Sequence, residues 1–137
     1  MNRKGFTLVE IMIVVAIIAL LAAIAIPNLM SAKRTANTAA AKANVRALST
    51  AAEVFATGHS GTYPSTVDSV AATGIVPYIA AAETLCGETV QGYVYVCTLA
   101  TTGYTITATP SGATAGDTTF TVETGGNIEE EPYVAPV

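Results

Sequence analysis

The sequence predicts an α+β fold in which one long N-terminal helix packs against a small antiparallel β-sheet. Residues 11–26 are sixteen consecutive apolar residues. The alanine-rich stretch that follows contains no glycine or proline between Pro27 and Gly58, which favours helix. Three later segments alternate polar and apolar residues with the period of two typical of half-buried strands. The 137 residues are enough for one domain with a modest core.

The N-terminal apolar run has the length and composition of a membrane-spanning helix. A helix over residues 6–31 would rise roughly 39 Å, at about 1.5 Å per residue, and would cross a ~30 Å hydrocarbon core with some tilt. Arg3 and Lys4 precede the run, and basic residues at this position stay on the cytoplasmic side. The rest of the chain should therefore face the other side of the membrane.

A secretory signal peptide is the alternative interpretation of this segment. Ala23-Ile24-Ala25 offers a small-residue cleavage site, after which the chain would begin at Ile26. Glu10 argues against it, since a carboxylate near the centre of a bilayer costs about 2.5–3.5 kcal/mol and a discarded peptide has no use for one.

The residues Gly5-Phe6-Thr7-Leu8-Val9-Glu10, followed by the apolar run, resemble the class III signal of type IV pilins and of the related pseudopilins of type II secretion systems. The resemblance is close over residues 1–32. It implies that a membrane prepilin peptidase cuts after Gly5 and that the new α-amino group of Phe6 is methylated. It further implies that Glu10 carries the assembly charge and that Pro27 kinks the helix.

The resemblance also implies a pilin-like organisation of the chain. We expect a cleaved leader at residues 1–5 and a helix for the membrane and the filament core at residues 6–31. An amphipathic helical half at residues 32–58 should lead into a globular β-sheet head at residues 59–128. An acidic C-terminal tail at residues 129–137 should follow.

The expected role of Glu10 follows from electrostatics. An unpaired carboxylate in lipid should seek a cation, and the free α-amine of Phe6 in a neighbouring subunit would serve and would also set the axial register. The alternative is a Glu10 that is solvated at the depth of the lipid headgroups. Pro27 removes one helical N–H donor, which predicts either a simple bend or a locally unwound stretch around residues 20–28.

The second half of the helix is predicted to be amphipathic and to end near Gly58, a natural C′ residue. Side chains at spacings of three and four form a mostly apolar stripe: Thr38, Ala41, Val45, Leu48, Ala52 and Phe55. Other side chains are expected to lie largely away from this stripe: Lys42, Arg46, Ser49 and Glu53. A face of this kind needs a partner to pack on.

The partner is a sheet of three or slightly more strands, predicted over residues 92–99, 103–110 and 118–124. The connections ATTG and SGATAGD have the composition of turns. The acidic tail from Ile128 onward is expected to be poorly ordered, with Glu129–Glu131 as a solvated run.

Cys86 and Cys97 are expected to form one disulfide, because the export signal places them in an oxidising compartment. Two free thiols are the alternative. A bridge across the ten intervening residues would stabilise the fold by about 2–3 kcal/mol in the chain-entropy model.

The sequence argues against an enzyme. It contains no P-loop, no dinucleotide fingerprint, no Ser/His/Asp cluster and no metal-spaced His/Cys set, so no cofactor or metal ligand is assigned. His59 is expected to be a loop residue. Every charge beyond Arg46 is acidic, which makes nucleic acid an unfavourable partner for the C-terminal part. Loss of Arg3 and Lys4 with the leader would change the formal net charge from −4 to −6.

These inferences favour a structural subunit of a type IV pilus that serves adhesion, motility or surface contact. The subunit would wait as a single-pass inner-membrane protein with its C-terminus outside and then enter an extracellular filament. Its implied partners are copies of itself, the prepilin peptidase, the inner-membrane assembly platform, minor pilins and, before assembly, membrane lipid. The alternatives are a pseudopilin of a type II secretion system and a membrane-tethered binding module that never polymerises.

Overall fold

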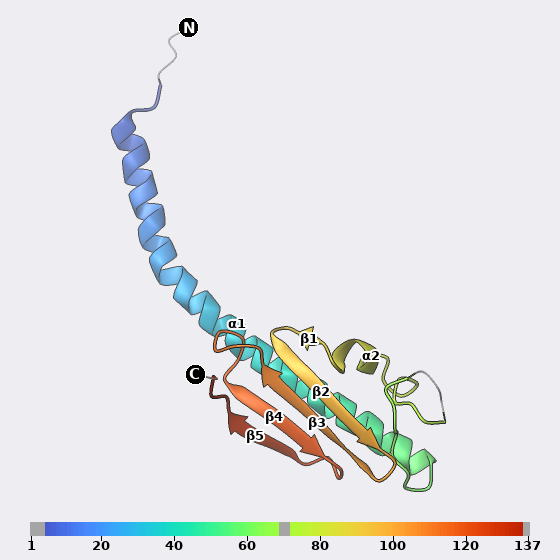
Figure 1. Cartoon of the computed structure of the whole chain (residues 1–137). Coiled ribbons are helices and arrows are strands. Elements are labelled where there is room, and N and C mark those ends of the chain that lie inside the picture. Colours follow the sequence, from blue (N-terminus) through green and yellow to red (C-terminus); the bar gives the residue numbers. More distant parts are fainter. Residues whose placement is uncertain (1–4, 69–71, 136–137) are drawn as a thin grey trace. The chain divides into compact units, whose positions relative to one another are not determined.

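The computed structural model describes residues 5–68 and 72–135 and confirms the predicted α+β fold, with a long N-terminal helix and a five-stranded antiparallel sheet (Figure 1). Helix α1 comprises 51 residues, Leu8–Gly58. The chain divides into two compact units, Met1–Lys33 and Arg34–Val137. We call them the N-terminal unit and the globular unit.

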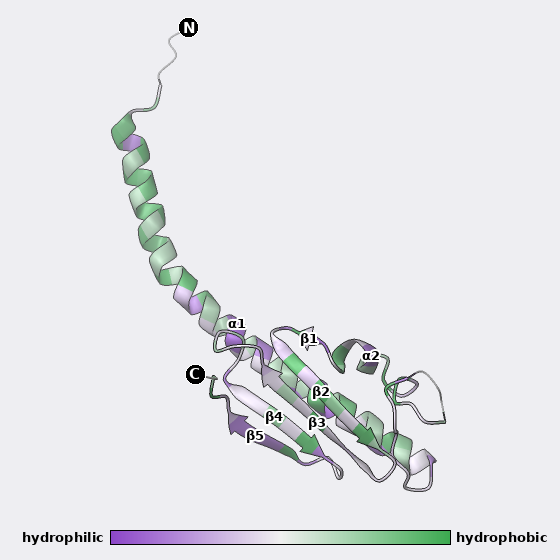
Figure 2. Ribbon diagram, viewed as in Figure 1, coloured by the Kyte–Doolittle hydropathy of each residue, from purple (hydrophilic) through white to green (hydrophobic). Residues whose placement is uncertain are grey.

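In the N-terminal unit, α1 is apolar on all sides over residues 11–26, and its large apolar side chains are exposed (Figure 2). Of the helices in the described part of the chain, α1 is the one that is long and apolar enough to cross a membrane. Its most apolar 18-residue window has a mean hydropathy of 3.0, with 0% of the window buried. Pro27 lies inside α1, which is helical on both sides of it.

In the globular unit, α1 uses the predicted stripe to pack against the sheet. Five side chains of this stripe have exposed fractions of 1% or less: Ala41, Val45, Leu48, Ala52 and Phe55. Spacings of three and four residues bring these side chains onto one face of the helix. Thr38, at the start of the stripe, is half-buried.

Two residues that were expected to lie away from the sheet face it instead. Ser49 is 4% exposed and shares a 2.8 Å hydrogen bond with the hydroxyl of Tyr104. The carboxylate of Glu53 accepts hydrogen bonds from the sheet and from the loop that follows α1. The expectation was wrong because it classified polar side chains as solvent-facing, whereas tyrosine hydroxyls in the sheet provide buried polar partners.

The end of α1 at Gly58 confirms the expected boundary, but Gly58 does not have the expected C′ role. Gly58 is the last residue of the helix, and the left-handed backbone conformations fall on Ser60, with φ of 56°, and Gly61, with φ of 86°. The Gly61 N–H donates to the Ala56 carbonyl at 2.9 Å, which satisfies one of the carbonyls left open at a helix C-terminus.

The sheet is an antiparallel meander in the order β1-β2-β3-β4-β5. Its strands are Thr89–Val90, Tyr93–Ala100, Gly103–Pro110, Thr118–Glu123 and Ile128–Pro132. Alternate side chains of β2, β3 and β4 point toward α1 and complete the core: Tyr93, Tyr95, Tyr104, Ile106, Ala108, Phe120 and Val122. The three strands predicted from alternation are therefore confirmed as β2, β3 and β4.

The expectation that the acidic tail is poorly ordered was wrong for its first part. Ile128–Pro132 forms β5 and pairs with β4 from Val122↔Ile128 to Thr118↔Pro132. The sheet thus extends beyond residue 128, where the β-sheet head was expected to end. Glutamate is depleted in strands, so the local sequence does not favour a strand here. The strand forms because β4 supplies hydrogen-bond partners for its backbone.

Cys86 and Cys97 form the expected disulfide, with their Cα atoms 5.4 Å apart. Cys97 lies in β2, and Cys86 follows the short helix α2, Ala82–Leu85. Cys86 also forms an isolated bridge with Tyr95 of β2. The disulfide therefore ties the segment between α1 and the sheet to the second strand.

Candidate functional site

The start of α1 is organised around Thr7 and Glu10. The Thr7 hydroxyl accepts from the Glu10 N–H at 3.3 Å, and the Glu10 carboxylate accepts from the Thr7 N–H at 3.4 Å. This reciprocal arrangement is a capping box, in which the N-cap residue and the third helical residue satisfy each other's backbone donors. The capping box is not among the features expected from the sequence, although its signal, Thr-x-x-Glu before an apolar run, is present there.

The capping box gives Glu10 a partner within its own chain. The carboxylate lies in the first turn of α1, where the positive end of the helix dipole favours negative charge. Both hydrogen bonds from Thr7 to the carboxylate are long, 3.4 Å from the N–H and 3.5 Å from the hydroxyl. Glu10 is also exposed, so a cation from another molecule can reach its carboxylate.

The cleavage and methylation residues predicted from the sequence lie next to this turn. Phe6 is 82% exposed, and both Gly5 and Phe6 precede the helix in non-helical backbone. Residues 1–4 of the expected leader lie outside the described residues. The structure thus brings Gly5, Phe6 and Glu10 together at one end of α1, while Pro27 lies further along the helix and the disulfide lies in the other unit.

In the globular unit, Glu53 is the centre of a polar network beneath the sheet. Its carboxylate accepts from the Tyr63 hydroxyl at 3.1 Å, the Tyr104 hydroxyl at 3.0 Å and the Gly125 N–H at 2.8 Å. These three donors come from the loop after α1, from β3 and from the β4–β5 turn. One helical carboxylate therefore joins three segments that are far apart in the sequence.

The environment of this network raises the pKa of Tyr104. Burial disfavours the charged phenolate and, with the hydrogen bond to the Glu53 carboxylate, raises the pKa from the usual 10.0 to about 12, while the bond to Ser49 acts in the opposite direction. The folded chain therefore keeps Tyr104 neutral at a pH at which the unfolded chain ionises it. This contribution to stability is complete below pH 10 and is lost as the pH rises toward 12.

Substitution Tyr104→Phe is expected to make stability less dependent on alkaline pH. The variant should lose less of its unfolding free energy between pH 10 and 12 than the parent. The slope of its unfolding free energy against pH should correspond to the release of up to about one proton fewer on unfolding. Urea unfolding of the full-length chain in detergent, followed by near-ultraviolet circular dichroism at several pH values, measures this slope. Equal slopes for the two proteins would contradict the assignment.

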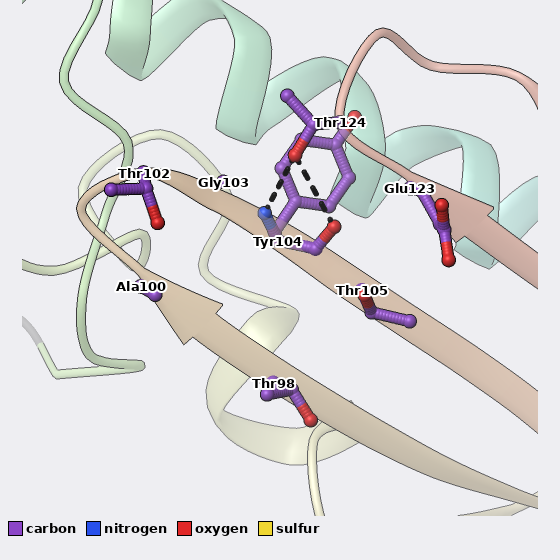
Figure 3. A pocket seen from close by; sticks show the side chains of 8 residues that line it. All are labelled: Thr98, Ala100, Thr102, Gly103, Tyr104, Thr105, Glu123 and Thr124. Atoms are coloured by element: carbon purple, nitrogen blue, oxygen red, sulfur yellow. Dashed lines mark hydrogen bonds between the residues drawn. The ribbon is translucent and has the colours of Figure 1, made fainter.

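The outer face of the sheet has a shallow hollow of about 330 Å³ at its β2–β3 end (Figure 3). Four threonines and one carboxylate contribute to its lining: Thr98, Thr102, Thr105, Thr124 and Glu123. The Thr124 hydroxyl accepts from the Tyr104 N–H at 2.9 Å and so is already used by the backbone. The hollow contains no histidine, cysteine or cation, and it pairs no nucleophile with a base.

The one histidine, His59, has structural partners. His59 stacks on Phe55 with ring centroids 3.9 Å apart, and its Nδ1 lies 2.9 Å from the Phe55 carbonyl oxygen. Within residues 5–68 and 72–135, no group of three or more His, Cys, Asp or Glu side chains is placed to hold a metal ion.

Comparison with known proteins finds one family model and two relatives that each match a part of the chain. Residues 1–26 match the family model described as the prokaryotic N-terminal methylation motif. A stretch of 54 residues, 39% of this chain, is 54% identical to the type IV major pilin protein PilA of Myxococcus xanthus, of which it covers 24%. A stretch of 35 residues, 26% of this chain, is 57% identical to the type IV wide pilus major component PilA4 of Thermus thermophilus, of which it covers 27%.

The matched stretches thus span about a quarter of each relative. No solved structure matches the chain. The similarity includes Gly5, Phe6 and Glu10, the residues that the sequence analysis had singled out for processing and assembly.

Proposed function

We propose that this chain, which matches the prokaryotic N-terminal methylation motif and is similar over part of its length to type IV pilins, is the structural subunit of a type IV pilus. The observation that carries the proposal is the exposed apolar surface of α1 directly after Gly5–Glu10. Such a surface cannot remain in water, because burying apolar area is worth roughly 25 cal/mol per Å². Lipid covers it before assembly, and neighbouring copies cover it in the filament.

In this proposal, processing prepares the N-terminal unit for assembly. The prepilin peptidase removes residues 1–5 on the cytoplasmic side, and Phe6 becomes the methylated N-terminus. The mature chain is held in the inner membrane by α1, with the globular unit outside. The assembly platform then moves it into an extracellular filament together with minor pilins. The two relatives are major components of pili, and this favours a pilus over a secretion pseudopilus.

The proposal assigns a structural role to the globular unit and no catalysis. Its buried polar groups, Ser49 and the tyrosines of β2 and β3, are hydrogen-bonded to each other or to α1. They rigidify the unit and leave its outer sheet face for contact with surfaces.

The mass of the mature N-terminus and the location of the chain test this function. We expect a protein that begins with N-methyl-Phe6 and that is the main component of filaments sheared from the cell surface. A chain that begins at Ile26, the product of a signal-peptide cut, would overturn the proposal. A processed chain found only in the cell envelope of cells that make surface filaments would favour the pseudopilin or the tethered module.

A further inference from the structure

Charge is unevenly distributed in the globular unit. From Arg34 onward the chain has three cations, Arg34, Lys42 and Arg46, all on α1, and nine carboxylates, all after Arg46. Acidic units of one kind repel each other when they are brought side by side. A filament of this chain therefore needs contacts that place the few cations against carboxylates of the next copy.

Arg46 lies on the flank of α1 that faces β5. Lys42 defines this flank, because its ammonium pairs with the Glu130 carboxylate of β5 at 2.6 Å. Arg46 follows Lys42 by four residues, one turn further along the same side of the helix. Its side chain is exposed, and within residues 5–68 and 72–135 no carboxylate lies within ion-pair distance of it.

The opposite edge of the sheet is purely acidic. There α2 and the turn before β1 carry Glu83 and Glu88, both exposed, on the side of the sheet away from β5 (Figure 1). The Cys86–Cys97 disulfide holds this segment on β2, and the Tyr95 N–H donates to the Glu88 carbonyl at 3.1 Å. The two carboxylates are thus on an anchored backbone, and no lysine or arginine follows Arg46 in the sequence.

We propose that Arg46 of one copy pairs with Glu83 and Glu88 of a neighbouring copy in the filament. This inference rests on the proposed function, since it needs a polymer of the chain. A helical polymer is built on a heterologous interface, in which two different patches of the same molecule meet. The β5 flank of α1 and the α2–β1 edge are two such patches, of opposite charge and at opposite edges of one sheet.

The contact acts mainly on register and selectivity. An exposed ion pair changes an association constant by about fivefold or less, and salt screens it. Because the same contact recurs at every subunit, its loss should lower the filament yield, and most visibly at low ionic strength, where the ion pair is least screened.

Charge reversal in the full-length chain, expressed in its own cells, tests the pairing. Arg46→Glu should reduce sheared filaments about three- to tenfold relative to the membrane pool, and Glu83→Arg/Glu88→Arg should do the same. The triple variant that combines them should recover most of the yield. Glu123→Arg/Glu129→Arg is the control matched to Glu83→Arg/Glu88→Arg. It changes the net charge by the same amount, but on the outer face of the sheet.

The possible outcomes separate the two proposals. Normal yield from Arg46→Glu, no recovery in the triple variant, or an equal defect in the control would each overturn the pairing while filaments of the parent chain still support the proposed function. A parent chain that forms no filaments would refute the proposed function and the pairing together. Equal urea midpoints of the detergent-solubilised variants show that a lower yield is not a folding defect.

Discussion

A Glu10→Gln chain is expected to insert into the membrane like the parent but to form at least about tenfold less filament. Insertion depends on the apolar surface of α1, which the substitution does not change. In the proposed filament, the Glu10 carboxylate pairs with the α-amine of Phe6 in a neighbouring subunit. Its loss would leave that amine unpaired in an apolar environment, and removing one member of a buried pair costs about 3–5 kcal/mol. Immunoblots of sheared filaments and of the membrane fraction measure both quantities.

Glutamine is the informative substitution because of the capping box. It keeps the shape of the side chain and can still accept the Thr7 N–H, as glutamine does in other capping boxes. Glu10→Gln therefore removes the charge and leaves the helix start nearly intact.

Thr7→Ala is the complementary control. It removes the hydroxyl that accepts from the Glu10 N–H, which should lower the stability of the helix by about 1 kcal/mol, and it keeps the Glu10 carboxylate. We expect it to assemble nearly normally once its cleavage after Gly5 has been checked by mass. Normal filament yield from Glu10→Gln would refute the assembly charge, and a loss of filament from Thr7→Ala as large as that from Glu10→Gln would show that the capping box is itself needed for assembly.

The second large effect is expected at Gly116, on the connection between β3 and β4. A Cβ atom built at this position would lie 2.1 Å from the hydroxyl oxygen of Tyr93 and 2.5 Å from its Cζ. The Tyr93 ring is fully buried, and its hydroxyl bonds Thr38 and the Thr118 carbonyl, both at 3.1 Å. Gly116→Ala should therefore lower the unfolding free energy by about 3 kcal/mol, through overpacking and loss of these hydrogen bonds.

Gly112→Ala is the matched control in the same connection. Its added Cβ would meet nothing within 4 Å, so the expected change in unfolding free energy is within about 0.5 kcal/mol. Urea unfolding of both detergent-solubilised chains, followed by near-ultraviolet circular dichroism of the tyrosines, measures the difference. Equal midpoints for Gly116→Ala and the parent would show that Tyr93 can move aside.

Local patterns were enough to predict the helix, three strands and the N-terminal motif. A stripe such as Val45, Leu48 and Ala52 identifies a packed helix because the spacing alone brings the side chains onto one face. The alternation in β2, β3 and β4 works in the same way with a period of two. The motif from Gly5 to Glu10 is equally local, because its six residues are consecutive and end in the first turn of α1.

The sequence by itself therefore determined the fold class, the exposed apolar helix and the residues proposed for processing and assembly. Only the tertiary structure decided that Ser49 and Glu53 face the sheet, that Glu130 belongs to a strand and pairs with Lys42, and that Gly116 must lack a side chain. These features depend on partners far away in the chain, such as Tyr104 for Ser49 and Tyr93 for Gly116. Pattern and propensity describe neighbours along the chain, whereas a buried polar contact or a tight approach exists only after distant segments have packed together.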